Sequence, residues 1–441
     1  MHDQDNLLSR LRKQRFQLSG VYVFSGAIIF LFICSLCCNA LTDGQIFENL
    51  FYKDRMDTAM DFFHSIVYVS RKTPYTQYAV VYPPLANFFF FIFAASVPED
   101  IRLTWAESYA DSILMRGTAT DLRVSQYTLF LFLIYIVFLA VFTYFVISVL
   151  FKGTNWEKRL FAISFLCSTG FLFALERGNI VILAALLAFV FMRLKDSKNP
   201  FLSELGLISL AISAGLKIYP ALLGIFLIFD KQYKKAFRGI IYGLLFFFVP
   251  FYFFEGTEAI AIFLNKLVAF SDSSGDLSIT GYSLQQVIKP LLVLFGVENW
   301  APYVQSAKYI GYVILLVSIL VIPFASRWKT VGLLTMAMFM FPGKISSGTL
   351  SYLILPLAFF MTNFEQRTVS KWWYLVLYIL VLGAIPFPSI PFFQCLEDGY
   401  SLNLFVIQMA ELALLITYLL DCLAEATCTV KKILRSNRKC T

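Results

Sequence analysis

Two acidic residues and a histidine stand in a polar stretch near the N-terminus at a spacing that could support proton transfer. Asp57 and Asp61 are four residues apart, and His64 follows Asp61 by three. On a helix this spacing places the three side chains on one face. Two carboxylates and an imidazole at an apolar boundary can supply a general base with an adjusted pKa. A solvated amphipathic turn has the same composition, so both interpretations stay open on spacing alone.

Single basic residues interrupt apolar stretches at three places. Arg177 begins the sequence Arg-Gly-Asn, which ends at Asn179; Lys217 comes just before Tyr219 and a proline; Lys344 follows a Pro-Gly pair. Lysine is an effective point-charge partner for phosphate, and arginine binds phosphate through a fork of donors. Snorkelling to the interface is the alternative for Arg177, and a buried ion pair is the alternative for Lys217. The pattern favours an anion site at Lys217.

Tyrosine and glutamine residues mark two further candidate positions. Tyr82 opens the sequence Tyr-Pro-Pro-Leu, in which the prolines fix how the chain enters a helix. Tyr282 and Gln285 lie in the segment 271–286, which is rich in serine, glycine and aspartate. Such a segment suits a flexible lid or a sugar-binding loop. A plain helix start and an ordinary surface loop are the respective alternatives.

The elements that must position these residues are membrane helices. The chain has 441 residues, of which 59% are hydrophobic and 15% are charged, against roughly 45–50% and about 25% in soluble domains. Apolar runs recur from Val21 to Leu420 without period-2 alternation. Only helices and closed barrels satisfy the backbone in lipid, and this pattern favours helices. We therefore predict an all-α polytopic membrane protein whose residues 1–441 form one integral membrane domain.

The net charge of +8 is explained by topology rather than by nucleic-acid binding, because the basic residues lie in short runs between apolar segments. The basic N-terminal segment predicts a cytoplasmic N-terminus. Further along the chain, every second loop between apolar runs is rich in basic residues. Both termini are then cytoplasmic and the apolar runs form about twelve spans. The predicted spans are 18–40, 125–151, 160–175, 178–194, 203–216, 218–230, 239–254, 305–325, 330–341, 350–362, 372–387 and 402–421.

An even number of spans, with both termini in the cytoplasm, requires that the short apolar stretch from Leu85 to Val97 does not cross the membrane. We predict that it forms a helix at the outer interface, within a first outer loop at about 41–124. A second outer loop is expected at about 255–304. The segments on either side of Lys217 are short and meet at Pro220, which predicts a broken helical hairpin at about 203–230. Irregular backbone at membrane depth is found where it lines a polar cavity.

Metal and cofactor sites have little support in the sequence. His2 and His64 are the only histidines, and the eight cysteines include no Cys-x-x-Cys pair. A histidine-rich metal cluster is therefore impossible. No cofactor is expected, although the outer acids leave a divalent metal open.

The order of these features resembles glycosyltransferase family 87 and its relatives in the GT-C superfamily. The resemblance rests on the acid pair Asp57–Asp61, then Tyr82–Leu85, then Arg177–Asn179, then Gly215–Pro220, and it covers about residues 20–360. Family members often carry Gly-Gln-Asn where this chain has Arg-Gly-Asn.

The resemblance implies a GT-C fold, a polyprenyl-phosphate-linked donor of mannose, arabinofuranose or another hexose or pentose, and inversion at the anomeric carbon. It implies a metal-free site on the extracytoplasmic side of the cell (inner or plasma) membrane, with a glycan or glycolipid as acceptor. The superfamily uses an acid of the first outer loop as base, here Asp61, which an aromatic residue follows, or Asp57. We expect Lys217, Arg177 and Lys344 to bind the donor phosphate, and His64, Tyr82, Asn179, Tyr219, Tyr282 and Gln285 to contact the substrates.

Two other functions fit parts of the pattern. An outer-leaflet polysaccharide polymerase or ligase uses diphosphate-linked substrates and usually depends on arginine and histidine in a large outer loop, where this chain has only His64. A lipid-linked sugar transporter or flippase would place acids within spans, and Glu411 in the last span is one such residue. No repeat symmetry between the two halves is visible.

Overall fold

The computed structural model describes residues 19–51, 58–78, 80–108, 122–272, 281–340, 345–364, 369–387 and 400–437, which contain helices and no strand. The helices of the N-terminal half are α2 (Gly20–Leu41), α3 (Gln45–Leu50), α4 (Met60–Ser70), α5 (Pro84–Ala94), α6 (Glu99–Ser108), η3 (Leu122–Val124), α7 (Gln126–Leu150), α8 (Asn155–Leu166), α9 (Thr169–Arg177), α10 (Val181–Leu194) and α11 (Pro200–Leu216). The remaining helices are η4 (Tyr219–Gly224), α12 (Ile225–Phe229), α13 (Tyr233–Phe248), η5 (Val249–Phe253), α14 (Gly256–Asp272), α15 (Leu284–Leu294), α16 (Ala301–Leu320), α17 (Arg327–Met340), η7 (Ser347–Leu353), α18 (Ile354–Thr362), α19 (Val369–Leu382) and α20 (Leu402–Asn437).

Within the described residues, five helical segments are long and apolar enough to cross a membrane: α2, α7, α13 together with η5, α16 and α20. The pair α8 and α9, bent by 55°, makes a sixth if it counts as one span. These helices identify a membrane protein. Each of the other apolar runs of the sequence also lies in a helix, but those helices are shorter. The number of crossings and their direction therefore stay predictions.

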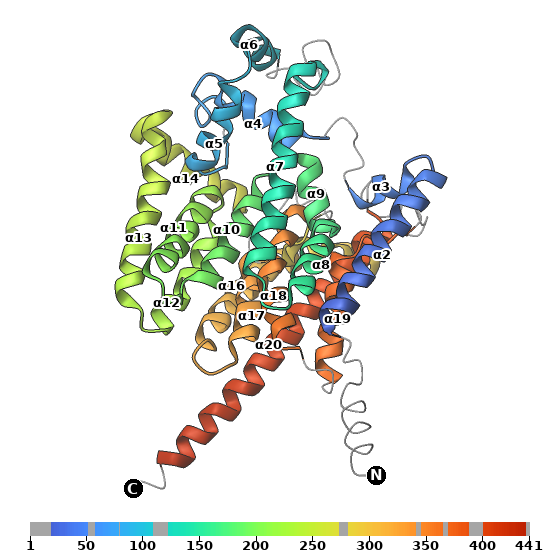
Figure 1. The fold of residues 1–441 in the computed structure, drawn as a ribbon, viewed down its shortest axis with the longest axis vertical. Coiled ribbons are helices and arrows are strands. Elements are labelled where there is room, and N and C mark those ends of the chain that lie inside the picture. The colour runs from blue at the N-terminus through green and yellow to red at the C-terminus, as the bar shows by residue number, and fades with distance from the viewer. Residues whose placement is uncertain are drawn as a thin grey trace, which may run out of the picture.

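Helices α4, α5 and α6 gather at one end of the molecule, near the start of α7 (Figure 1). The C-terminal part of α20 projects from the opposite end (Figure 1). Helix α5 has 11 residues, and a span needs about 20, so α5 alone does not cross a bilayer. Its predicted place at the outer interface stays a prediction.

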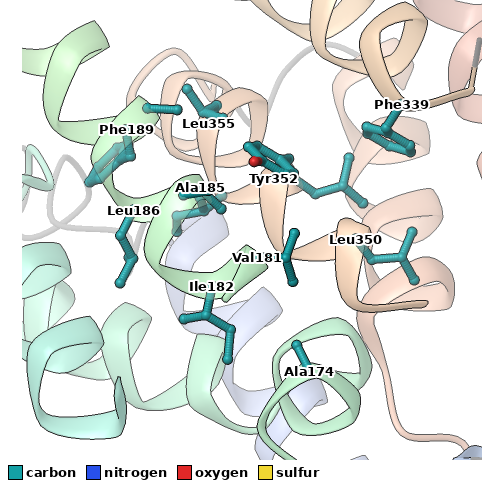
Figure 2. Close-up of a cluster of buried hydrophobic side chains, with 14 of the residues drawn as sticks. Ala174, Val181, Ile182, Ala185, Leu186, Phe189, Phe339, Leu350, Tyr352 and Leu355 are labelled. Atoms are coloured by element: carbon teal, nitrogen blue, oxygen red, sulfur yellow. The ribbon is translucent and has the colours of Figure 1, made fainter. Parts of the chain in front are cut away.

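The core beneath this end is built around α10, which is buried along almost its whole length. Figure 2 shows Val181 of α10 near Leu350 of η7, and Ala185 of α10 near Tyr352. Helix α9 also packs closely on η7, because Gly170 of α9 faces Leu350. A Cβ on this glycine would lie 2.7 Å from the Leu350 Cβ. The packing therefore fixes η7 against the link between α9 and α10.

Helix α11 ends abruptly at Leu216. Lys217 is extended, with φ −146° and ψ 129°, and the 3-10 helix η4 begins at Tyr219 with Pro220 in its first turn. Proline lacks the N–H that would bond the carbonyl of Leu216, so the hydrogen-bond pattern of α11 cannot continue through this point. Lys217 therefore stands between two helical segments and belongs to neither.

Candidate active site

Asp61 lies in the first turn of α4, and the start of this helix is attached to the end of α9. Ala59 adopts a left-handed conformation before the helix, with φ 60°. Its N–H donates to the carbonyl of Glu176 over 3.2 Å, which satisfies one of the carbonyls that the end of α9 leaves without an intrahelical partner. The N-terminus of α4 also favours a negative side chain at Asp61.

Both oxygens of the Asp61 carboxylate accept hydrogen bonds from the link between α9 and α10. Arg177 Nη2 lies 2.9 Å from Oδ1, and Asn179 Nδ2 lies 2.6 Å from Oδ2. The side chains of Asp61 and Arg177 are only 18% and 12% exposed. The Asn179 Oδ1 atom accepts the N–H of Val181 over 2.9 Å. One amide therefore caps the start of α10 and orients the carboxylate.

The charge state of Asp61 follows from these contacts. Burial by itself would raise the pKa of this carboxyl, but the charge and hydrogen bond of Arg177, the hydrogen bond of Asn179 and the more distant charge of Lys217 outweigh burial and lower the pKa below its ordinary value. Asp61 is therefore a carboxylate at neutral pH, which is the form that accepts a proton.

Gly178 makes this geometry possible for two reasons. It ends α9 in the left-handed conformation, with φ +68°. Glycine adopts this conformation without strain because it has no Cβ. A Cβ at this position would also lie 2.6 Å from the Cβ of Phe62, the residue next to Asp61. The sequence Arg-Gly-Asn is thus required as a turn that presents its two polar side chains to α4.

We expect Gly178→Ala to destabilise the protein more than Gly296→Ala. Gly296 also follows a helix in the left-handed conformation, but no atom lies within 4 Å of its Cβ position. Both variants lose about 1–2 kcal/mol to backbone strain, and Gly178→Ala adds an overpacking cost of about 1–3 kcal/mol. Thermal unfolding midpoints in detergent measure the difference. Equal midpoints for the two variants would contradict the contact with Phe62.

Tyr82 lies between Lys217 and Asn179, the residue that bonds Asp61. Its hydroxyl accepts from Asn179 Nδ2 over 3.4 Å, and the Lys217 Nζ lies 4.1 Å from the centroid of its ring. A cation over an aromatic face is attracted by the ring quadrupole without losing its charge. Within the described part of the chain, no acidic side chain forms a salt bridge with Lys217. Its ammonium is therefore able to receive an anion.

Aromatic hydroxyls surround this centre. The Tyr219 ring packs against that of Tyr352 with centroids 5.5 Å apart, and Tyr135 stacks on Phe62 at 5.0 Å. The hydroxyls of Tyr135 and Tyr352 are buried and have no hydrogen-bond partner among the described residues. Sequence reasoning missed both residues, because single tyrosines in apolar helices of a phenylalanine-rich chain give no distinguishing signal.

Tyr282 and Gln285 belong to a second cluster. The Tyr282 N–H donates to the carbonyl of Ile345 over 3.3 Å, and its hydroxyl bonds the Ser347 side chain. The Gln285 amide donates to the carbonyl of Val304 over 3.2 Å. Since Ser347 belongs to η7, as Tyr352 does, this helix borders both clusters.

Three predicted residues remain, of which His64 is described and two lie outside the described residues. The His64 ring packs on Tyr68 of the same helix, with centroids 5.9 Å apart. Asp57 and Lys344 lie outside the described residues. Among the residues that the structure describes, no three His, Cys, Asp or Glu side chains are grouped to hold a metal ion.

The arrangement joins a carboxylate, a paired arginine and an open lysine in a largely buried site. The family model described as glycosyltransferase family 87 matches residues 81–346, which is more than half of the chain. The chain belongs to glycosyltransferase family 87. It is thus a glycosyltransferase with membrane helices. No curated protein and no solved structure matches it.

The residue at which the family 87 match begins separates the candidate site residues into two groups. The match includes Tyr82, Arg177, Asn179 and Lys217, but it begins after Asp61. The case for Asp61 as a functional group therefore rests on its hydrogen bonds to two residues inside the matched range.

Proposed function

We propose that this protein is an inverting glycosyltransferase that moves a sugar from a polyprenyl-phosphate donor to a lipid-linked or cell-envelope glycan acceptor on the extracytoplasmic side. The sugar is mannose, arabinofuranose or another hexose or pentose. The observation that carries the proposal is that Asn179 bonds both the Asp61 carboxylate and the Tyr82 hydroxyl, while the Lys217 ammonium lies over the Tyr82 ring. A base and a phosphate-binding cation are the two groups that such a transfer needs.

The charge balance favours a donor with one phosphate. The charge of Arg177 is offset by Asp61 at 2.9 Å, so Lys217 supplies the net positive charge among the described residues of the centre. A diphosphate carries more charge than this centre balances, which argues against the polymerase or ligase alternative. Lys344 is proposed to join the phosphate site, and Asp57 is an alternative base.

The transfer proceeds as one in-line displacement. The acceptor hydroxyl gives its proton to Asp61 while its oxygen attacks the anomeric carbon. The bond from this carbon to the phosphate oxygen breaks, and the electron pair leaves with the polyprenyl phosphate. Lys217 stabilises the charge that develops on the leaving phosphate. His64, Tyr82, Asn179, Tyr219, Tyr282 and Gln285 are proposed to hold the sugar and the acceptor.

Arg177 has a double role in this proposal. In the free protein it pairs with Asp61, which makes the carboxylate a weaker base. A bound donor phosphate competes for the same guanidinium, because arginine binds phosphate and carboxylate with the same fork of donors. Asp61 then becomes more basic only when the donor is present.

This role predicts a pH dependence. Activity that needs the Asp61 carboxylate is lost as the pH falls through the pKa of this group, which Arg177, Asn179 and Lys217 lower despite its burial. Once the donor draws Arg177 away, the pKa rises. We expect the acid limb of kcat, which reports the complex, at higher pH than the acid limb of kcat/KM, which reports the free enzyme. Coincident limbs would contradict the exchange of Arg177.

The proposed setting is a GT-C-type fold in the cell (inner or plasma) membrane, with twelve spans and both termini in the cytoplasm. Helices α4 to α6 lie at the end opposite to the C-terminal part of α20 (Figure 1), and that part of α20 carries Lys431, Lys432 and Arg435. Basic residues favour the cytoplasmic side. This supports an outer position for Asp61 and an interfacial one for α5.

Transport of a lipid-linked sugar is the second candidate. Glu411 of α20 is fully buried, and in the part of the chain that the structure describes neither of its carboxylate oxygens has a hydrogen-bond partner. An acid of this kind inside a membrane helix is typical of transport pathways.

The deciding experiment uses the purified protein in proteoliposomes. Polyprenyl monophosphate carrying a radiolabelled sugar is offered with a membrane glycan extract as acceptor, and the matching diphosphate is offered in a second arm. Movement of label to the acceptor from the monophosphate only is the expected result. Transfer only from the diphosphate, or movement of the donor across the bilayer without transfer, would replace this proposal with one of the two alternatives.

A further inference from the structure

Glu255, between η5 and α14, holds the loop that leads to Tyr82. Its carboxylate accepts the N–H groups of Tyr75 and Thr76, each over 2.9 Å, and the Thr76 hydroxyl as well. Three donors thus converge on one carboxylate from a segment 180 residues away in sequence. Hydrogen bonds to an ionised acceptor are roughly twice as strong as neutral ones.

Tyr75 connects Glu255 to Tyr82, because it is bonded to both residues. Its side chain is only 1% exposed and packs between Phe251 and Phe263. Its hydroxyl donates to the carbonyl of Tyr82 over 3.1 Å and accepts from the side-chain amide of Asn87 over 3.0 Å. Both ends of the Tyr75 residue are therefore fixed, one by Glu255 and one by the turn that carries Tyr82.

The turn depends on this outside support. Tyr82 is followed by Pro83 and Pro84, which have no backbone N–H to form a hydrogen bond of their own. The carbonyl of Tyr82 is held instead by Tyr75. The Tyr82 ring in turn supports the ammonium of Lys217.

We propose that Glu255 is a positioning residue for donor binding: through Tyr75 it fixes the Tyr82 turn and so the place of the Lys217 ammonium. This inference rests on the proposed function, because it takes Lys217 as the group that receives the donor phosphate. It also connects the start of the predicted second outer loop to the transfer site.

The test compares Glu255→Ala, Tyr75→Phe and their combination with Glu258→Ala as control. Glu258 is an exposed acid three residues along the same segment. We expect the donor KM to rise about tenfold in Glu255→Ala, with the acceptor KM within twofold of the wild type. Glu255→Gln keeps one acceptor oxygen and should fall between wild type and Glu255→Ala. Glu258→Ala should match the wild type.

The combined variant tests the shared route. If both residues act through the Tyr82 turn, the double variant has a donor KM within about twofold of the worse single variant. A donor KM that rises by the product of the two single-variant fold-changes would show that Glu255 and Tyr75 act independently. That result would overturn the role of Tyr75 as the link between Glu255 and Tyr82. A loss of folded protein with an unchanged donor KM in the surviving fraction would reduce Glu255 to a stabilising contact and overturn the proposal.

A readout that needs no substrate separates this inference from the proposed function. Amide hydrogen exchange of residues 75–82 in nanodiscs should become at least tenfold faster in Glu255→Ala and stay unchanged in Glu258→Ala. Unchanged exchange in Glu255→Ala overturns the inference whatever the activity. Suppose that exchange is faster in Glu255→Ala but the wild-type protein transfers no sugar from any polyprenyl phosphate. The role of Glu255 in restraining residues 75–82 then stands, and the proposed function is overturned.

Discussion

Asp61→Asn is expected to lower the rate of sugar transfer by about 10²–10⁴-fold, the usual contribution of a positioned general base. Asparagine keeps the size and can still accept a hydrogen bond from Arg177, but it cannot accept the proton of the acceptor hydroxyl. The effect should appear mainly in kcat, because the donor phosphate is proposed to bind at Lys217. Initial rates with a labelled polyprenyl-phosphate sugar measure it, and Asp57→Asn measured beside it decides between the two candidate bases.

Folding must be separated from chemistry in this variant. Asp61→Asn leaves Arg177, which is 12% exposed, without its counter-charge, and breaking a buried pair in this way costs about 3–5 kcal/mol. The double variant Asp61→Asn/Arg177→Gln removes that unpaired charge and should stay folded yet inactive. Asp100→Asn, at an exposed acid of α6, is the matched control and should keep full activity. Retention of more than half the wild-type rate by Asp61→Asn, with Asp57→Asn equally active, would remove the acid pair from the mechanism.

Lys217→Ala is expected to reduce kcat/KM for the donor by about 10²–10³-fold, the cost of removing one preorganised group that stabilises developing charge. Its ammonium has no acidic partner in a salt bridge among the described residues, so the loss falls on the donor phosphate rather than on an internal ion pair. Lys217→Arg should recover part of the activity. Lys266→Ala, at an exposed lysine of α14, controls for the general loss of one positive charge. A Lys217→Ala protein with the donor KM and kcat of the wild type would exclude Lys217 from the site.

The individual residues of this centre were more predictable than their pairing. Lys217, Arg177 and Tyr82 stood out because each interrupts or borders an apolar run. The sequence did not predict that Arg177 bonds Asp61, since 116 positions separate them and no local pattern encodes such a contact. The same holds for Glu255 and Tyr75, whose partnership depends on how η5 packs on the loop before α5.

The helices followed the apolar runs closely, but two boundaries differ for physical reasons. The last predicted span is 402–421, and the helix that contains it continues to Asn437. Asp421 and Glu425 pair with Lys329 and so stay within a helix that packs on α17. The run predicted at 160–175 is the bent pair of α8 and α9. Its bend lies at Ser168, whose hydroxyl bonds the carbonyl of Phe165, a contact that competes with regular helix.

The pairing of Asp61 with Arg177 also bears on how the protein is made. Chains emerge from the ribosome from the N-terminus at about 5–20 residues per second, so α4 is synthesised well before α9 and must wait for the residues that complete it. During that interval the carboxylate has neither its arginine nor its asparagine partner. A nascent chain interrupted before residue 177 contains Asp61, the proposed base, but neither of the residues that bond it, and we expect quality-control proteases to recognise that exposed, unfinished segment. Assembly of the transfer centre is therefore a late event in biogenesis.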